Sequence, residues 1–266
     1  MCATCGCTVD FDEPGDFGDP GELGGLELPG HGHDHGHDHG REHPHNDGRT
    51  VTLQQKILAK NDNLAQRNRD WLRERGILAI NLMSSPGSGK TTLLERTSED
   101  LAGKLALSVI EGDQETDLDA DRIRSAGCEV VQINTGAGCH LDAAMVARAL
   151  RTLDPPAGSA VVIENVGNLV CPALFDLGET ARVVLASVTE GTDKPLKYPQ
   201  MFRSADLVVV TKTDLGPYVN FDAARFGEYV GQVSPRAMTI NLSAVTGSGM
   251  ASWSDWLTSM VSAPAH

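Results

Sequence analysis

The sequence predicts an α/β fold in which a mostly parallel sheet is covered by helices on both faces. From residue 76 onward, short β-branched runs alternate with amphipathic stretches, and the runs are continuously apolar instead of alternating in polarity. A strand that is apolar on both sides is buried on both faces, which is typical of parallel sheets. Ligands of such sheets bind beyond the carboxyl ends of the strands, so functional side chains are expected there.

The elements of this fold follow one another in a clear order. A first helix is expected at residues 51–75, because apolar side chains return at seven-residue steps and form one stripe that packs on the domain or contacts a partner. The stripe contains Ile57, Leu64 and Trp71, and beside them Leu58, Ala65 and Leu72. Strands are expected at residues 77–84, 105–110, 128–133, 160–163, 183–188, 207–210 and 238–241. Further helices are expected at residues 91–102, 118–125, 142–153, 222–230 and 250–261.

Residues 1–50 differ in composition from the rest of the chain. They hold 11 Asp and Glu against two Arg, and Gly, Pro, Asp and His dominate without a sustained apolar run. Such a stretch cannot bury enough surface to offset its chain entropy. We therefore expect a disordered, Cys- and His-rich metal-binding tail at residues 1–50 and one globular domain, with its N-terminal helix, at residues 51–266.

Charge and hydropathy argue against two classes of protein. The formal net charge is −14, without the clustered Lys and Arg that nucleic-acid binding requires. No apolar run approaches the length of a membrane span, and the first 30 residues lack the charged-then-apolar order of a signal peptide. The protein is therefore expected to be cytoplasmic, with neither a nucleic acid nor a membrane as partner.

A phosphate-binding loop connects the first strand of the predicted sheet to a helix. Its sequence is Ser84-Ser85-Pro86-Gly87-Ser88-Gly89-Lys90-Thr91-Thr92, with Ser84 where the strict pattern has Gly. Gly87 and Gly89 let the backbone N–H groups turn toward the phosphates, at the positive end of the helix. Lys90 reaches the β and γ oxygens, and Thr91 offers a hydroxyl to Mg²⁺. Residues 86–92 are the predicted phosphate-binding residues.

The residues that read the base are expected after the last two strands. Thr211-Lys212-Thr213-Asp214 resembles the guanine-reading Asn-Lys-x-Asp motif, in which Asp214 accepts from guanine N–H groups and Lys212 lies along the base. Ser243-Ala244 resembles the loop that contacts the guanine carbonyl. Thr211 replaces the usual Asn, and whether its shorter side chain reaches the neighbouring loops is open, so an ATPase is kept as the alternative to a GTPase.

Two acids at strand ends complete the predicted catalytic set. Asp113 follows the second strand and Glu164 ends the fourth, which places both near Mg²⁺ or the attacking water; ordinary solvated strand-end acids are the alternative. Gly167 is a candidate for sensing the γ-phosphate through its backbone N–H. The predicted catalytic residues are Lys90, Asp113, Glu164 and Gly167, and the predicted Mg²⁺ ligands are Thr91, Asp113 and Glu164.

Metal-ligand residues occur in three places. Cys2, Cys5 and Cys7 lie within six residues, and three thiols so close can converge on one soft ion such as Ni²⁺, Zn²⁺ or Cu⁺. A histidine tract follows, interleaved with Gly and Asp, and it indicates a weak metal store without identifying nickel; an expression tag is the alternative. The tract comprises His31, His33, His35, His37, His39, His43 and His45.

The third group of candidate ligands lies inside the domain. Cys139 and His140 precede a helix, and Cys171 comes seven positions after Glu164, so both segments follow strands on the side of the sheet where ligands gather. A buried core pair is the alternative. Three ligands are too few for a closed structural site, which favours an exchangeable ligand or a second copy of the chain across a twofold axis. Cys128 begins a strand and is expected to be a buried core thiol.

In this order the motifs resemble the HypB family of nickel-inserting GTPases, which belong to the SIMIBI class of P-loop GTPases and act in nickel–iron hydrogenase maturation. The resemblance covers residues 50–261 and the tail, where the Cys-x-x-Cys-Gly-Cys start is peculiar to that family. Asn165-Val166-Gly167-Asn168 and Glu190-Gly191-Thr192-Asp193-Lys194-Pro195 also look like family segments. A urease-type nickel GTPase is the nearest alternative, and a nickel or zinc buffer with a regulatory nucleotide site is another.

The resemblance implies sites, ligands and partners. It implies a high-affinity nickel site at Cys2, Cys5 and Cys7, and a second site for nickel or zinc at Cys139, His140 and Cys171, near a dimer interface. The implied ligands are GTP or GDP, Mg²⁺, Ni²⁺ and Zn²⁺. The implied partners are a second copy of the chain, in a nucleotide- or metal-dependent homodimer, a nickel-delivery scaffold protein and the hydrogenase large-subunit precursor. We hypothesise that γ-phosphate contact at Gly167 moves Cys171 relative to the other two ligands.

Overall fold

The structure, a computed structural model, describes residues 47–113, 118–136 and 138–262. Side chains are described from residue 55 onward, except that of residue 113. The predicted ligands Cys2, Cys5 and Cys7 and the seven histidines from His31 to His45 lie outside the described residues. Nearly all of the predicted domain is described.

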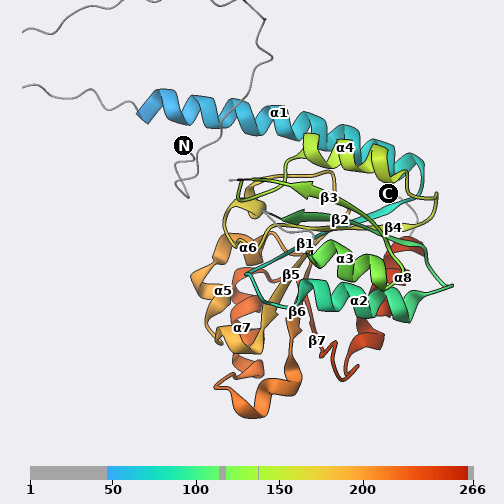
Figure 1. Cartoon of the computed structure of the whole chain (residues 1–266). Coiled ribbons are helices and arrows are strands. Elements are labelled where there is room, and N and C mark those ends of the chain that lie inside the picture. Colours follow the sequence, from blue (N-terminus) through green and yellow to red (C-terminus); the bar gives the residue numbers. More distant parts are fainter. Residues whose placement is uncertain (1–46, 114–117, 137, 263–266) are drawn as a thin grey trace, which may run out of the picture.

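Seven parallel strands form one sheet in the order β3-β2-β4-β1-β5-β6-β7 (Figure 1). Their bounds are β1 Leu78–Ser84, β2 Leu107–Asp113, β3 Glu129–Asn134, β4 Ala160–Glu164, β5 Ala181–Ser187, β6 Leu207–Thr211 and β7 Met238–Asn241. All seven predicted strands are present; β7 has the predicted bounds, and the other six differ from the prediction at one or both ends. Strand β1 lies between β4 and β5, at the centre of the sheet. The loops that follow β1 and its neighbours therefore come together at the carboxyl edge of the sheet.

Helices cover both faces of this sheet, as the sequence predicts. The bounds of the longer helices are α1 Asp47–Glu74, α2 Lys90–Leu101, α3 Leu118–Ser125, α4 Ala143–Leu153, α7 Ala223–Val233 and α8 Met250–Ser262. The shorter elements are α5 Lys194–Lys197, α6 Pro199–Arg203, η1 Cys171–Leu174, η2 Val188–Glu190 and η3 Thr213–Tyr218. None of the shorter elements was expected from periodicity, because one or two turns are too brief to show it.

Successive side chains of the central strands pack into different hydrophobic cores, on opposite faces of the sheet. Leu78, Ile80 and Leu82 of β1 belong to the core under α2, α3 and α8, whereas Ala79 belongs to the core under α1 and α4. Met83 lies on the face covered by α6 and α7. Burial on both faces explains why the strands read as unbroken apolar runs.

Helix α1 is held on the domain by buried polar contacts as well as by its apolar stripe. Asn68 donates from Nδ2 to the carbonyls of Ala143 and Leu177, at 2.8 and 3.0 Å. Arg69 Nη2 donates to both carboxylate oxygens of Asp176, at 2.7 and 2.8 Å, in a partly buried ion pair. The helix begins at Asp47, inside the stretch predicted as tail. No helix of the described residues is long and apolar enough to cross a membrane.

Strand β2 begins two residues later and ends three residues later than predicted. The amide of Leu105 still bonds to Leu101 at the end of α2, which delays the strand. At the other end, Glu111 pairs in register with Glu164 of β4, so the ladder continues through residues whose polarity had indicated a loop. Asp113 is therefore the last residue of a strand instead of the start of a loop.

Candidate functional site

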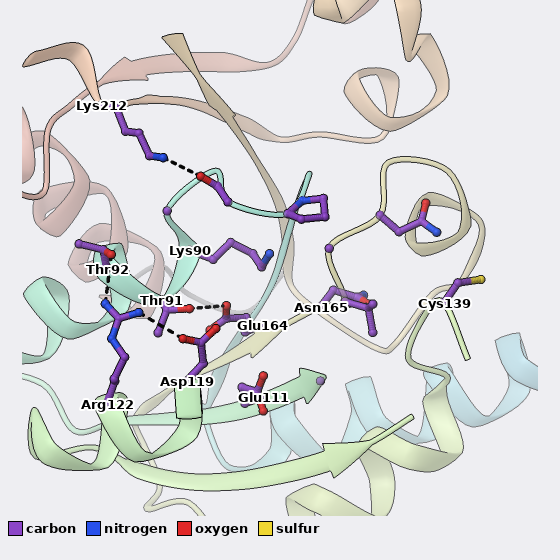
Figure 2. A pocket seen from close by; sticks show the side chains of 17 residues that line it. Lys90, Thr91, Thr92, Glu111, Asp119, Arg122, Cys139, Glu164, Asn165 and Lys212 are labelled. Carbon is purple, nitrogen blue, oxygen red and sulfur yellow. Dashed lines mark hydrogen bonds and ion pairs between the residues drawn. The ribbon is translucent and has the colours of Figure 1, made fainter. Parts of the chain in front are cut away.

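A cavity of about 480 Å³ opens at the carboxyl ends of β1, β2 and β4 (Figure 2). The predicted residues that line it are Pro86, Gly87, Gly89, Lys90, Thr91, Thr92, Glu164, Gly167 and Lys212. The eight lining residues that sequence reasoning did not assign to the nucleotide are Glu111, Gly112, Asp119, Arg122, Cys139, Asn165, Val166 and Asn168. This is the edge of the sheet at which a parallel fold gathers its ligands.

The loop before α2 has the backbone conformation that phosphate binding requires. Gly87 and Gly89 have φ values of +71° and +93°, a region that side chains with a Cβ rarely adopt. The two turns lead into the first residue of α2, so the free N–H groups of this helix end face the cavity. Lys90 is buried and donates to Ser84 Oγ at 3.1 Å. The serine in place of the usual glycine thus holds the lysine inside the loop.

Thr91 and Glu164 form a contact that fits a divalent cation. Thr91 Oγ1 donates to Glu164 Oε1 at 3.1 Å, while Glu164 Oε2 is buried without a hydrogen-bond partner among the described residues. Burial raises the pKa of Glu164 to about 7, although Lys90 and the Thr91 hydroxyl lower it. A buried carboxylate with an unused oxygen beside a threonine hydroxyl is a donor set that suits Mg²⁺.

The predicted acid Asp113 closes β2, and its side chain lies outside the described residues. Glu111, two residues earlier on the same strand, is 2% exposed and lines the cavity. Its register opposite Glu164 places both side chains on the same face of the sheet. Strand alternation would have identified Glu111 from the sequence, had the strand been extended to Asp113.

Arg122 approaches the phosphate loop from α3. Its guanidinium contacts Thr92 Oγ1 at 3.3 Å, Asp119 at 3.2 Å and Glu95 at 2.7 Å. Asp119 and Arg122 both line the cavity, as Figure 2 shows. Sequence reasoning missed them because an Asp and an Arg three positions apart on an amphipathic helix resemble an ordinary solvated pair.

The residues after β6 close over the phosphate loop. Thr211 is buried, and its Oγ1 donates to the carbonyl of Ser88 at 2.7 Å. Lys212 has the left-handed φ of 56° and donates to the carbonyl of Gly87 at 2.7 Å. The short side chain of Thr211 therefore does reach the phosphate loop, because the carboxyl end of β6 lies close to that loop.

The remaining base-reading candidates lie beside the cavity and are not part of its lining. Asp214 is half-buried in η3, while Ser243 and Ala244 follow β7. The amide of Thr213 bonds to Leu242 at 3.2 Å and so brings the two loops together. The structure thus places Asp214 and Ser243 at the ends of adjacent strands, next to Lys212.

The structure brings together the three predicted metal ligands of the domain. One ligand atom each of Cys139, His140 and Cys171 lies within 4.8 Å of the others. Both cysteines are buried, and the His140 ring stacks on Phe175 with centroids 3.9 Å apart. Burial lowers the pKa of His140, with partial opposition from the Asp142 charge, so its ring favours the neutral form that binds metals. Cys128, by contrast, is a buried core thiol, as predicted.

One loop connects these ligands to the phosphate loop. Gly167 lies so close to Pro86 that an added Cβ would be 3.0 Å from the proline nitrogen. The next residue, Asn168, accepts from the amides of Val170 and Cys171 at 2.8 and 3.4 Å. Because Cys139 also lines the cavity, the metal-ligand triad and the nucleotide cavity share a wall. In Figure 2, Asn165 lies between Glu164 and Cys139.

The fold and the loop together define a P-loop nucleotide-binding protein. A profile described as the CobW/HypB/UreG nucleotide-binding domain matches residues 78–241. The hydrogenase maturation factor HypB of Rhizobium leguminosarum is 54% identical over 209 residues, covering 79% of this chain and 70% of that protein. HypB of Cupriavidus necator is 42% identical and covers 97% of this chain and 88% of its own length.

A solved structure agrees with these relatives. HypB from Helicobacter pylori in complex with nickel superimposes with a TM-score of 0.72 at 38% identity, covering 76% of this chain and 95% of that one. This chain belongs to the HypB family of hydrogenase maturation factors.

Proposed function

We propose that the chain is a GTP-hydrolysing metallochaperone that takes up nickel and delivers it to the large-subunit precursor of a nickel–iron hydrogenase. The observation that carries this proposal is the shared wall: Cys139 belongs both to the metal-ligand triad and to the lining of the nucleotide cavity. A bound nucleotide that moves Cys139 would change the geometry of the metal-ligand triad, and a metal bound there would in turn change the nucleotide cavity. The nickel-bound relative from Helicobacter pylori supports nickel as the cargo.

In this proposal the chain's own residues bind and orient the nucleotide. Lys90 and the N–H groups of the loop hold the phosphates, while Thr91 and Glu164 hold Mg²⁺, with Asp113 as a further candidate. When bound, Mg²⁺ neutralises charge on the phosphate oxygens. Lys212, Asp214, Ser243 and Ala244 are assigned to the guanine base, and Thr211 tethers their strand to the phosphate loop.

The nickel sites are assigned to two parts of the chain. Cys139, His140 and Cys171 form a site for nickel or zinc, and the remaining coordination positions are open to an exchangeable ligand or to a second copy of the chain in a homodimer. Cys2, Cys5 and Cys7 are assigned to a tighter nickel site and the tail histidines to a store. A delivery scaffold protein is the further proposed partner.

The coupling between nucleotide and nickel is assigned to residues 167–171. Gly167 packs on Pro86, and Asn168 holds the amide of Cys171. A γ-phosphate that displaces Gly167 would move Cys171 against the other two ligands, which changes nickel affinity.

The first experiment tests hydrolysis. Lys90→Ala is expected to abolish GTP turnover, whereas Lys104→Ala, which changes an exposed lysine in the turn after α2, is expected to leave it unchanged. The readout is phosphate release, with nickel uptake measured on the same samples to show that the triad is intact. Turnover that survives in Lys90→Ala would overturn the enzymatic part and favour a nickel buffer with a regulatory nucleotide site.

The second experiment tests coupling. Nickel affinity would be measured in a chain with Cys2, Cys5 and Cys7 replaced by serine, once with GDP and once with a non-hydrolysable GTP analogue. We expect different affinities, and no difference once Cys171 is also replaced. Equal affinities in the two nucleotides would reject the coupling.

A further inference from the structure

The N-terminal helix leaves part of its apolar stripe uncovered. Of the two rows predicted from the sequence, Ala65 and Leu72 are buried against the domain. The other row is not: Ile57 is 37% exposed, and Leu64 and Trp71 are only partly buried. One row of the stripe is therefore buried against the domain, while the other row is only partly covered.

Leu64 and Trp71 of this partly covered row line a groove of about 280 Å³ between α1 and α4. The two helices lie side by side in Figure 1. Apolar side chains form its floor, with Leu64 and Trp71 from α1 and Ala147 and Leu150 from α4. The groove is therefore an apolar trough open to solvent.

The rim of the groove is basic. Arg67 and Arg151 line it, both are exposed, and neither forms an ion pair within the described part of the chain. Arg75 extends the positive rim, with its guanidinium 4.0 Å from the centre of the Trp71 ring. Helix α4 carries no acidic residue. The occupant that fits this groove is consequently an acidic segment with apolar side chains.

We propose that residues 9–28 of the chain itself occupy this groove. This segment contains seven Asp and Glu and no Lys or Arg, and its apolar residues are Val9, Phe11, Phe17, Leu23, Leu26 and Leu28. Acidic and apolar side chains in alternation match a trough with a basic rim in both charge and hydropathy. No other segment within residues 1–46 combines acidic and apolar side chains in this way.

The chain between the proposed segment and α1 is long enough for the segment to reach the groove. Leu64 lies about 26 Å from the first residue of α1 along the helix axis, at the usual rise per residue. The chain between residues 28 and 47 spans up to roughly 60 Å when extended. The tail therefore reaches the groove of its own domain. Docking there also brings residues 2–7 toward α4, whose first residue comes three positions after His140.

Photo-crosslinking of the full-length chain tests this inference. A benzophenone amino acid replaces Phe17, and the purified protein is irradiated without nucleotide or nickel. We expect crosslinks within one chain to residues 64–75 of α1 and 147–151 of α4. The double variant Arg67→Glu and Arg151→Glu should lower their yield roughly fivefold to tenfold, and so should high salt. Crosslinks elsewhere, or none, overturn the proposal.

Two further variants test whether the crosslinks depend on the charges of the groove and of the tail. Arg203→Glu with Arg236→Glu makes the same charge change at exposed arginines on the β5–β7 half of the domain and should leave the yield unchanged. Replacing Asp10, Asp12, Glu13 and Asp16 by Asn or Gln leaves the domain intact and should remove the crosslinks. Products of twice the chain mass would show a second copy in the groove and overturn the intramolecular arrangement. Since neither nickel nor nucleotide is present, failure here leaves the proposed function untouched.

Discussion

Asn165 accepts a hydrogen bond from the backbone amide of Leu141, with 3.3 Å between Oδ1 and the amide nitrogen. Asn165 follows the last residue of β4, Glu164, and Leu141 follows the candidate ligand His140. Asn165 also donates to Asn81 Oδ1 at 3.1 Å, and it is 1% exposed. One buried amide thus connects the strand end that lines the cavity to the segment that carries two of the candidate metal ligands.

Replacing Asn165 by alanine is therefore expected to affect stability and coupling together. The change leaves the Leu141 amide and Asn81 Oδ1 without this partner, which costs about 1–3 kcal/mol of unfolding free energy. We also expect the difference in nickel affinity between GDP and a GTP analogue to shrink. Urea unfolding and nickel titration measure the two effects. Asn134→Ala, at the exposed end of β3, is the control, and a variant that loses stability but keeps the full difference would contradict the coupling role.

The hydroxyl of Thr211 is predicted to support nucleotide binding. Thr211→Val keeps the shape of the side chain but removes the donor to the Ser88 carbonyl, a buried contact of 2.7 Å. Leaving that carbonyl unpaired costs about 1–2 kcal/mol, or roughly a fivefold to thirtyfold loss of affinity if the loop rearranges. Competition with a fluorescent guanine nucleotide measures it, and Thr211→Ser, which keeps the hydroxyl, should bind as the parent chain does. Equal binding of all three chains would exclude this role.

Much of this fold could be predicted from the sequence, because continuous apolar runs identify buried parallel strands without ambiguity. The phosphate loop could be predicted too, since its glycines and lysine are adjacent in the chain. Glu111 and Arg122 could not, because their importance depends on where β2 ends and on which face α3 presents. The contact of Thr211 with the phosphate loop could not be predicted either, because it depends on the distance between the end of β6 and a loop more than 100 residues away in the chain.

The docking of α1 is predicted to weaken in acid. Burial raises the pKa of Asp176, but hydrogen bonds from Arg69 and from the Gly178 amide outweigh it, so this pKa lies below its usual value of 3.8. A depressed carboxyl pKa contributes stability above the unfolded-state value, and this is lost as pH falls through the folded-state value. Both partners are about one-third exposed, so screening limits the contribution to about 0.5–1 kcal/mol.

Asp176→Asn tests this expectation at two pH values. The variant should unfold at lower urea concentration than the parent near pH 7, and the difference should diminish as pH falls below 3.8 and through the folded-state pKa of Asp176. Asp70→Asn is a matched control, because Asp70 pairs with Arg73 on the exposed side of the same helix at 3.4 Å. A difference that is constant with pH would show that the carboxylate charge does not hold the helix.

A pH dependence of the same sign, in a higher pH range, is expected from His140, the one histidine among the described residues. Burial lowers its pKa below the usual 6.5, so between these two values the unfolded chain binds a proton that the folded domain does not. The contribution of His140 to stability therefore rises with pH across that window, by at most about 1.4 kcal/mol per pH unit, whereas Glu164, whose pKa burial raises to about 7, contributes a fall as pH rises toward 7. His140→Gln in metal-free protein should flatten this rise in urea midpoints measured from pH 5 to 7.5. An unchanged slope would show that the pKa of His140 is the same in the folded and the unfolded chain, and would place its ring in contact with solvent.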